Sequence, residues 1–238
     1  MTGTLLNIAT VLVGGTLGLL LGSRLPQRIR QTVVAGLGLF TAALGIKLFI
    51  GTQNGIVVLA ALLFGGVLGE WAQIEAGLAR LGEWLHAHFA KDAEGGSVRF
   101  VRGFLTASLV FCIGPLTILG SIQDGLSGDY QLLAIKSVLD GFAAMVFAST
   151  LGVGVLFSTL VILIYQGALT LLAGQAQALF SDAMINEFSA TGGVLLIGIA
   201  VSSLLEIKPI RVGNFLPALI VAPLIVLLLS LFGISLAP

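Results

Sequence analysis

The sequence has little charge for its size. Asp, Glu, Lys and Arg together make up 9% of its 238 residues, whereas soluble domains carry about 25%. With 57% hydrophobic residues and a mean hydropathy of +1.11, the chain cannot cover its surface in water. Its solvent must therefore be lipid, and membrane lipid is its first expected partner. The net charge of zero gives no basic excess for a nucleic acid.

Cysteine and histidine are almost absent. Cys112 is the only cysteine, so an intrachain disulfide and a cysteine metal site are excluded. The two histidines, His86 and His88, are two positions apart and would lie on different faces of a helix. We therefore expect no metal, no cofactor and no catalytic residues. No spacing of a nucleophile and a base stands out, so an enzyme is the least favoured class.

Long apolar windows predict an all-α, polytopic membrane protein with about eight spans. Each window approaches the roughly 20 residues that cross a bilayer. We place the spans at roughly 4–23, 32–50, 55–70, 103–122, 131–149, 152–174, 190–206 and 214–235. The first window has no positive residues before it and is longer than a signal-peptide core, so a cleavable signal peptide is not expected.

The basic residues predict the orientation. They cluster in three loops that fall on one side of the membrane if the spans alternate, and that side should be the cytoplasm. Both termini would then be periplasmic. The loop residues are Arg24, Arg28, Arg30, Lys91, Arg99, Arg102, Lys208 and Arg211.

The segment 71–98 is the longest polar stretch, and it has an amphipathic pattern. Apolar residues recur at spacings of three and four, at Trp71, Ile74, Leu78, Leu81, Leu85 and Phe89. This pattern is typical of a helix that lies in the cytoplasmic membrane interface. The alternative is a helix that docks a partner protein.

Small residues form stripes on two spans. Gly14, Gly18 and Gly22 recur every four residues in the first span, and Gly65 and Gly69 do so in the third. Such stripes let helix backbones approach closely. We expect them to serve packing within the chain, with a homodimer contact as the alternative.

A weak internal repeat relates spans 1–3 to spans 6–8. Val13–Gly22 aligns with Tyr165–Gly174, and Gly38–Gly45 aligns with Gly193–Ala200. The displacement is an odd number of spans, so the copies would have inverted topology, as in many secondary transporters. The single membrane domain would comprise a first repeat (1–70), the interfacial helix (71–98), a central pair of spans (99–150) and a second repeat (151–238).

The central pair holds a polar cluster. Gly114 and Pro115 should break span four, because proline lacks an N–H and clashes with the preceding turn. Broken helices form substrate and ion sites in transporters. Four residues after the break offer oxygen ligands for a hard cation such as Na⁺, namely Thr117, Ser121, Gln123 and Asp124. The alternative is a structural kink whose hydroxyls bond back to the helix.

Asp140 is the strongest candidate for a functional residue. It lies near the middle of span five, and Lys136 lies four residues earlier on the same helix face. Charged groups at this depth are costly and tend to mark a pathway. The pair either fixes helix packing or exchanges a proton or cation. Asp124 and Asp129 lie near the outer end of the cluster, which also fits ordinary loop acids. Glu187 is expected in a solvated outer loop.

Four segments carry a family resemblance. Phe111–Asp129, Lys136–Gly141, Ala148–Phe157 and Val212–Pro223 are similar to the DUF554 family of bacterial inner-membrane proteins, and the likeness covers essentially the whole chain. The resemblance implies a bacterial inner-membrane location and supports the range of the span count. It supplies no substrate and no catalytic residue.

The leading functional hypothesis is a secondary transporter of a small solute or ion, coupled to protons or Na⁺. The inverted repeat, the broken span and the Asp140–Lys136 pair favour it. The alternatives are a channel, in which the same polar residues line a pore, and a non-transporting scaffold or sensor that uses the helix at 71–98.

Overall fold

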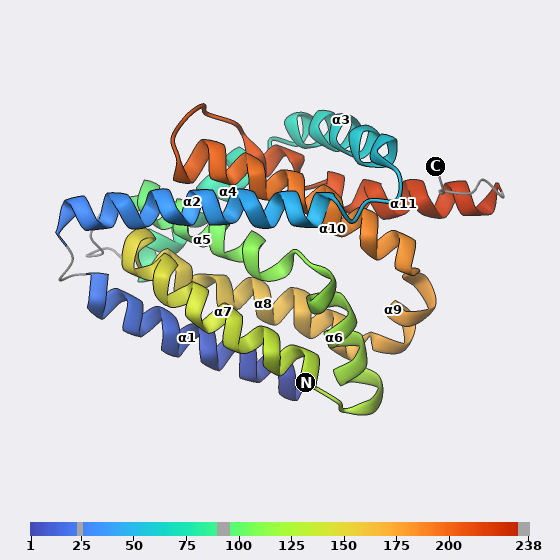
Figure 1. The fold of residues 1–238 in the computed structure, drawn as a ribbon, viewed down its shortest axis with the longest axis horizontal. Coiled ribbons are helices and arrows are strands. Elements are labelled where there is room, and N and C mark those ends of the chain that lie inside the picture. Colours follow the sequence, from blue (N-terminus) through green and yellow to red (C-terminus); the bar gives the residue numbers. More distant parts are fainter. Residues whose placement is uncertain (23–25, 90–95, 233–238) are drawn as a thin grey trace. The chain divides into compact units, whose positions relative to one another are not determined.

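The computed structural model describes residues 1–22, 26–89 and 96–232. Within these ranges every regular element is helical and no strand occurs. The α-helices are α1 (Thr2–Gly22), α2 (Gln27–Phe49), α3 (Gly55–Trp71), α4 (Ile74–Phe89), α5 (Gly96–Cys112), α6 (Pro115–Ser127), α7 (Gln131–Leu151), α8 (Gly154–Leu171), α9 (Ala173–Leu179), α10 (Asp182–Ile199) and α11 (Ala218–Leu231) (Figure 1). A π-helical turn, η1 (Ala200–Leu204), extends α10, and a 3-10 turn, η2 (Val212–Phe215), precedes α11.

The helices have the lengths that membrane crossing requires. Six of the described helical segments are long and apolar enough to span, and the number rises to eight if each of two bent pairs is one span. The bent pairs are α3 with α4, at 58°, and α5 with α6, at 63°. The all-helical, polytopic class is therefore confirmed, and the eight predicted windows correspond to these segments.

The break in span four is also confirmed. Helix α5 ends at Cys112 and α6 begins at Pro115, with Gly114 between them at φ +140°. Proline is tolerated in the first turn of a helix because its missing N–H has no intrahelical partner there. Glycine supplies the positive φ that a residue with a side chain rarely adopts.

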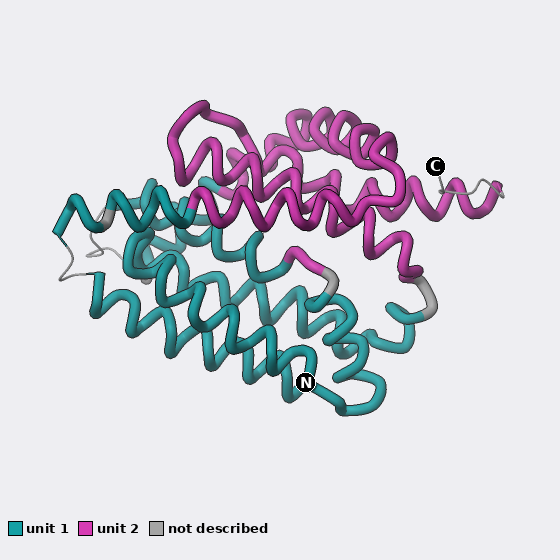
Figure 2. Tube along the Cα trace, in the orientation of Figure 1, with its two compact units in different colours: residues 1–37, 79–112, 116–177 teal, residues 38–78, 113–115, 178–238 magenta. Residues whose placement is uncertain are grey.

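The chain forms two compact units (Figure 2). Unit 1 comprises residues 1–37, 79–112 and 116–177, and unit 2 comprises residues 38–78, 113–115 and 178–238. Each unit thus combines segments that are distant in sequence. The inverted relation between spans 1–3 and 6–8, and the division at residues 70, 98 and 150, stay predictions.

The core of unit 1 is the close packing of α1 on α7, which run side by side (Figure 1). A Cβ added to Gly14, Gly18 or Gly22 would lie 2.0–2.3 Å from a carbonyl oxygen of α7. These oxygens belong, in the same order, to Gly141, Met145 and Ser149. The two helices therefore run parallel, as first and fifth spans must if the passes alternate. The glycine stripe serves packing within the chain.

Unit 2 packs in a similar way around α3, α10 and α11. A Cβ on Gly65 would lie 2.4 Å from the backbone nitrogen of Ala218, and Ala61 and Ala222 bury their methyl groups beside this contact. The second glycine stripe, like the first, is thus occupied by a neighbouring helix of the same chain.

The predicted amphipathic helix corresponds to α4, which is shorter than the predicted 71–98. Leu85 of its apolar face is buried against Phe100 and Phe104 of α5. Trp71, by contrast, is the last residue of α3 and is 85% exposed. Residues 90–95 of the predicted segment lie outside the described residues. The interfacial position of α4 stays a prediction.

Candidate functional site

Asp140 and Lys136 form a buried ion pair on α7. Their spacing of four residues places both side chains on one helix face, and Lys136 Nζ donates to Asp140 Oδ2. The Lys136 side chain is 7% exposed and that of Asp140 is 11% exposed. Asp140 is the tenth residue of this 21-residue helix, so it lies about 14 Å from the helix start at 1.5 Å per residue. The structure thus confirms the pairing.

A hydrogen-bonded network extends from this pair to two other helices. Asn7 of α1 donates one N–H to Asp140 Oδ2 and the other to Gln166 Oε1 of α8, both at 3.0 Å. Gln166 Nε2 donates to Thr4 Oγ1 at 3.3 Å. The hydroxyls of Thr4 and Thr170 share a hydrogen bond, with their oxygens 3.3 Å apart. The network therefore ties α1, α7 and α8 together within unit 1.

The network leaves one buried oxygen without a partner. Both N–H groups of the Asn7 amide are used, and its Oδ1 is buried with no hydrogen bond among the described residues. The amide orientation follows from its neighbours, because an ionised carboxylate only accepts and Gln166 uses its own nitrogen toward Thr4. Both donors to Asp140 reach the same oxygen, Oδ2. The site therefore has spare acceptor capacity at Asn7.

Asp124 is not an ordinary loop acid, and that expectation is wrong. It is 4% exposed, because α6 continues to Ser127 and carries the carboxylate against the start of α1. Asp124 Oδ2 accepts from the backbone N–H of Gly3 at 3.1 Å and pairs with the amino group of Met1 at 3.0 Å. The first N–H groups of a helix lack intrahelical partners, and a carboxylate there also interacts favourably with the helix dipole.

Gln123 and Asp129 form a separate contact. Gln123 Nε2 donates to Asp129 Oδ2 at 2.9 Å, and Asp129 Oδ1 accepts from the backbone N–H of Gln131 at 3.0 Å. These bonds fix the turn between α6 and α7. They involve none of the Asp140 network, so the structure does not bring Gln123 to Asp140.

Thr117 supports the helix break itself. The carbonyl of Phe111 would normally accept from the residue four positions later, which is Pro115 and has no N–H. Thr117 Oγ1 donates to this carbonyl at 3.3 Å. Ser121, one turn further along α6, is buried, and its hydroxyl has no partner among the described residues. Of the four expected cation ligands on α6, three thus bond to groups of the protein.

The expected position of Glu187 is also wrong. It was expected in a solvated loop, but α10 begins at Asp182 and Glu187 is 0% exposed. Its carboxylate accepts from Thr52 Oγ1 at 2.7 Å and from the backbone N–H groups of Gln53 and Asn54 at 2.7 and 3.1 Å. It therefore holds the turn that leads into α3, within unit 2.

A polar cluster also organises the turn before α11 in unit 2. Asn214 donates to Glu70 Oε2 at 2.6 Å and accepts from the backbone N–H of Glu75 at 2.8 Å. Glu75 accepts from the N–H of Gly213 at 2.6 Å. Arg211 pairs with Glu70 at 2.6 Å, but both side chains are more than half exposed. These bonds join η2 to the α3–α4 bend.

Sequence reasoning missed Asn7, Thr4 and Thr170 as members of the site. Asn7 was identifiable in principle, since it is the only Asn, Gln or charged residue within α1. Gln166 lies within the predicted sixth span, but the sequence does not indicate its partner. No group of three or more potential metal-ligating His, Cys, Asp or Glu side chains occurs among the described residues.

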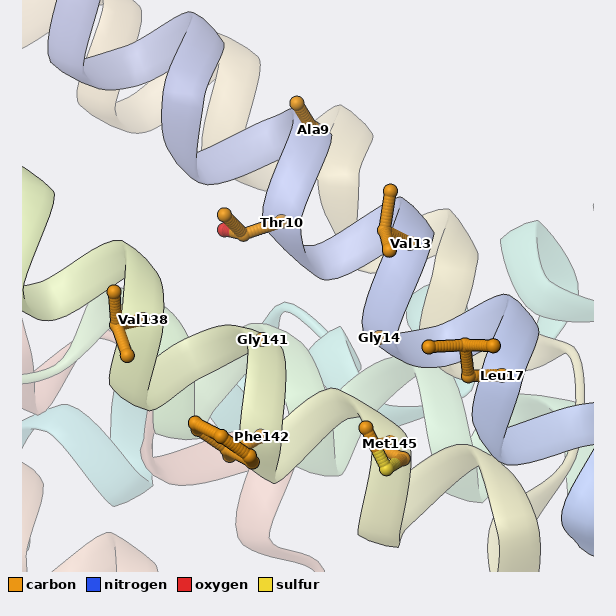
Figure 3. Close-up of a pocket in the computed structure, with 9 residues that line it drawn as sticks. All are labelled: Ala9, Thr10, Val13, Gly14, Leu17, Val138, Gly141, Phe142 and Met145. Atoms are coloured by element: carbon orange, nitrogen blue, oxygen red, sulfur yellow. The ribbon is translucent and has the colours of Figure 1, made fainter.

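An apolar groove lies between α1 and α7. Figure 3 shows Gly14 and Gly141 where the helices meet, with Val13, Leu17 and Phe142 around them. The polar side chain among its lining is Thr10, whose hydroxyl donates to the carbonyl of Asn7 at 2.9 Å. Asp140 is not part of the lining. The chemistry of the groove suits an acyl chain rather than a polar solute.

The fold and the site define a polytopic helical membrane protein with a charged, hydrogen-bonded network inside its spans. The model of the family "Protein of unknown function (DUF554)" matches residues 2–227, and the chain belongs to this family.

Two relatives are similar along nearly their whole length. "Uncharacterized protein YqgA" of Escherichia coli (strain K12) is 34% identical over 223 residues, covering 92% of this chain and 94% of the relative. "Uncharacterized membrane protein YdfK" of Bacillus subtilis (strain 168) is 29% identical over 238 residues, covering 98% and 99%. No solved structure matches the chain significantly.

Proposed function

We propose that this protein is a secondary transporter of a small solute or ion, driven by protons or Na⁺, and that Asp140 and Lys136 lie on its pathway. One observation carries the proposal: a buried ion pair sits near the middle of α7 and is hydrogen-bonded to Asn7 of α1. Ionisable groups inside spans mark substrate or ion pathways as a rule.

Energetics favour this interpretation over simple packing. Replacing a buried ion pair by apolar residues of similar volume is often neutral or stabilising, so stability alone does not require these charges. The Asp140 side chain is also 11% exposed, whereas the Asp124 side chain is 1% exposed.

The proposed location is the bacterial cytoplasmic membrane, with both termini periplasmic. The support is the sequence pattern, in which the basic loops fall on one side if the spans alternate; Arg28, Lys208 and Arg211 of these loops are exposed. The Bacillus relative is named a membrane protein. In a background without Cys112, a cysteine at Gln53 should react with an impermeant maleimide in spheroplasts, and one at Lys208 should not. The reverse pattern would invert the orientation.

The transport test uses the purified protein in proteoliposomes. Uptake of ²²Na⁺ and proton flux reported by a trapped pH dye are measured under imposed Na⁺, proton and electrical gradients. We expect a saturable flux that Asp140→Asn abolishes. The matched control is Asp129→Asn, which also removes one carboxylate but in the α6–α7 turn, and this variant should retain the flux.

Three results would contradict the proposal. Flux equal to wild type in Asp140→Asn would remove this residue from the mechanism. A protein that moves neither ion and no added solute under any gradient would count against coupled transport. Flux that does not saturate, with single-channel currents, would assign the same polar residues to a channel.

A further inference from the structure

We propose that Asp140 and Asn7 form a binding site for a monovalent cation, which the ammonium of Lys136 occupies in the present structure. The proposal names the ligand class of the site described above and rests on the proposed transport function. The network holds the Asp140 carboxylate with the ammonium of Lys136, and it also contains Asn7 Oδ1, which has no hydrogen-bond partner among the described residues.

The first support is the side-chain oxygen of Asn7. The residue is fully buried, and its Oδ1 has no partner among the described residues. A buried acceptor without a partner is costly and calls for an explanation such as an ion or water. Asn7 cannot easily turn away, because its amide nitrogen is held by Asp140 and Gln166, both at 3.0 Å.

The second support is the charge of the site. Lys136 and Asp140 together are neutral, so a further cation would add an uncompensated charge at a place where charge is costly. Exchange avoids this cost, since the entering cation replaces the ammonium at the same carboxylate. The electrostatics therefore favour a cation that competes with the Lys136 ammonium for Asp140 over one that binds in addition to it.

The third support is the reach of Lys136. It lies four residues nearer than Asp140 to the N-terminal end of α7, about 6 Å along the helix axis at 1.5 Å per residue. A lysine ammonium sits on a flexible stem of four carbons, and such side chains extend toward the membrane surface. Lys136 can thus leave Asp140 without a movement of the helix.

The ligand set points to a monovalent cation. Protein sites for Ca²⁺ use six to eight oxygens and usually several carboxylates, whereas this network has one carboxylate besides amides and hydroxyls. Oxygen-only ligands at a helix-lined site suit Na⁺. The lysine itself shows that a primary ammonium is also accommodated, so Na⁺ and a small organic ammonium are the two arms of the test.

The test measures binding and does not depend on transport. The full chain is purified in detergent, and its melting temperature is followed as NaCl, KCl or methylammonium chloride replaces choline chloride at constant ionic strength. A ligand that binds the folded protein raises the melting temperature with its concentration. We expect stabilisation of the wild type by one of the small cations.

The variant Lys136→Met distinguishes cation binding from a role in helix packing. Removing the competing ammonium should lower the half-saturating cation concentration by about tenfold or more, because a unit charge next to the carboxylate is lost. Asp140→Asn should abolish the response, and Asn7→Ala in the lysine-containing protein should raise the half-saturating concentration. Asp129→Asn is the control and should respond like wild type.

The outcomes separate the two proposals. Equal or weaker cation binding in Lys136→Met would overturn the competition. If that variant does not fold, an unchanged cation response in Asn7→Ala would overturn the assigned site. Flux that depends on Asp140 without any cation response would leave the transport proposal standing and refute this one. A cation response without flux would support the site and refute transport.

Discussion

The Lys136–Asp140 pair allows a double-mutant test that separates stability from function. Lys136→Met removes the ammonium and keeps an apolar stem. Asp140→Asn removes the negative charge but keeps an oxygen that accepts the N–H of Asn7, now 3.0 Å from Asp140 Oδ2. The double variant therefore loses both charges and retains the link between α7 and α1.

The burial of the ion pair sets the expected changes in the free energy of unfolding. Both side chains are at least 89% buried, since they are 7% and 11% exposed, so little discount for solvent screening applies. Removing one partner of a buried pair costs about 3–5 kcal/mol, whereas replacing both is often neutral. We expect the lower end, about 3 kcal/mol, for each single variant, because the remaining group can neutralise by gaining or losing a proton. The double variant should lie within about 1 kcal/mol of wild type.

Thermal unfolding in a mild detergent with choline chloride as the salt measures the stability. For a chain of this length a loss of 3 kcal/mol lowers the melting temperature by about 6–12 °C. Proteoliposome flux is then measured on the same four proteins. We expect the double variant to melt like wild type and to carry no flux, which would assign the charges to function.

Two results would refute this reasoning. Single variants as stable as wild type would show that the ion pair is not buried in the working protein. A double variant with wild-type flux would show that the pair serves helix packing alone.

Two further predictions concern stability and use the same melting assay. Gly18→Ala should cost about 1–3 kcal/mol, because its Cβ would lie 2.1 Å from the carbonyl oxygen of Met145; the control Gly36→Ala has no atom within 4 Å and should be neutral or gain up to about 1 kcal/mol from helix propensity. Equal losses would contradict the α1–α7 contact. Glu187→Gln should cost about 1–3 kcal/mol, because an amide nitrogen then replaces one of the two oxygens that accept from Thr52, Gln53 and Asn54. A variant as stable as wild type would contradict the buried hydrogen bonds of Glu187.

The candidate site was predictable only where it is local in sequence. Asp140 and Lys136 are four residues apart, and helical geometry alone places them together. Asn7 lies 133 residues from Asp140, and no local pattern indicates which face of α1 meets α7. Gly14, Gly18 and Gly22 predicted a close contact but not its partner.

The predicted positions of buried acids were wrong where a helix extends beyond its apolar window. Hydropathy placed the seventh span at about residue 190, but Ser181 caps α10 by accepting from the N–H of Met184, and the helix begins eight residues earlier, at Asp182. Glu187 is thereby inside a helix and buried. The capping serine followed by Asp182 was a readable signal for this start. Asp124 was misplaced for a related reason, since α6 runs on to Ser127.

The sequence by itself determined the class, the helical passes and the break before Pro115, because burial in lipid and the missing N–H of proline act locally along the chain. The tertiary structure alone decided which carboxylates are buried and what they contact. Asp140 meets Asn7, Asp124 meets Gly3, and Glu187 meets the turn before α3. The physical reason is that a carboxylate needs donors when it leaves water, and each of these three carboxylates finds donors in a segment distant in sequence.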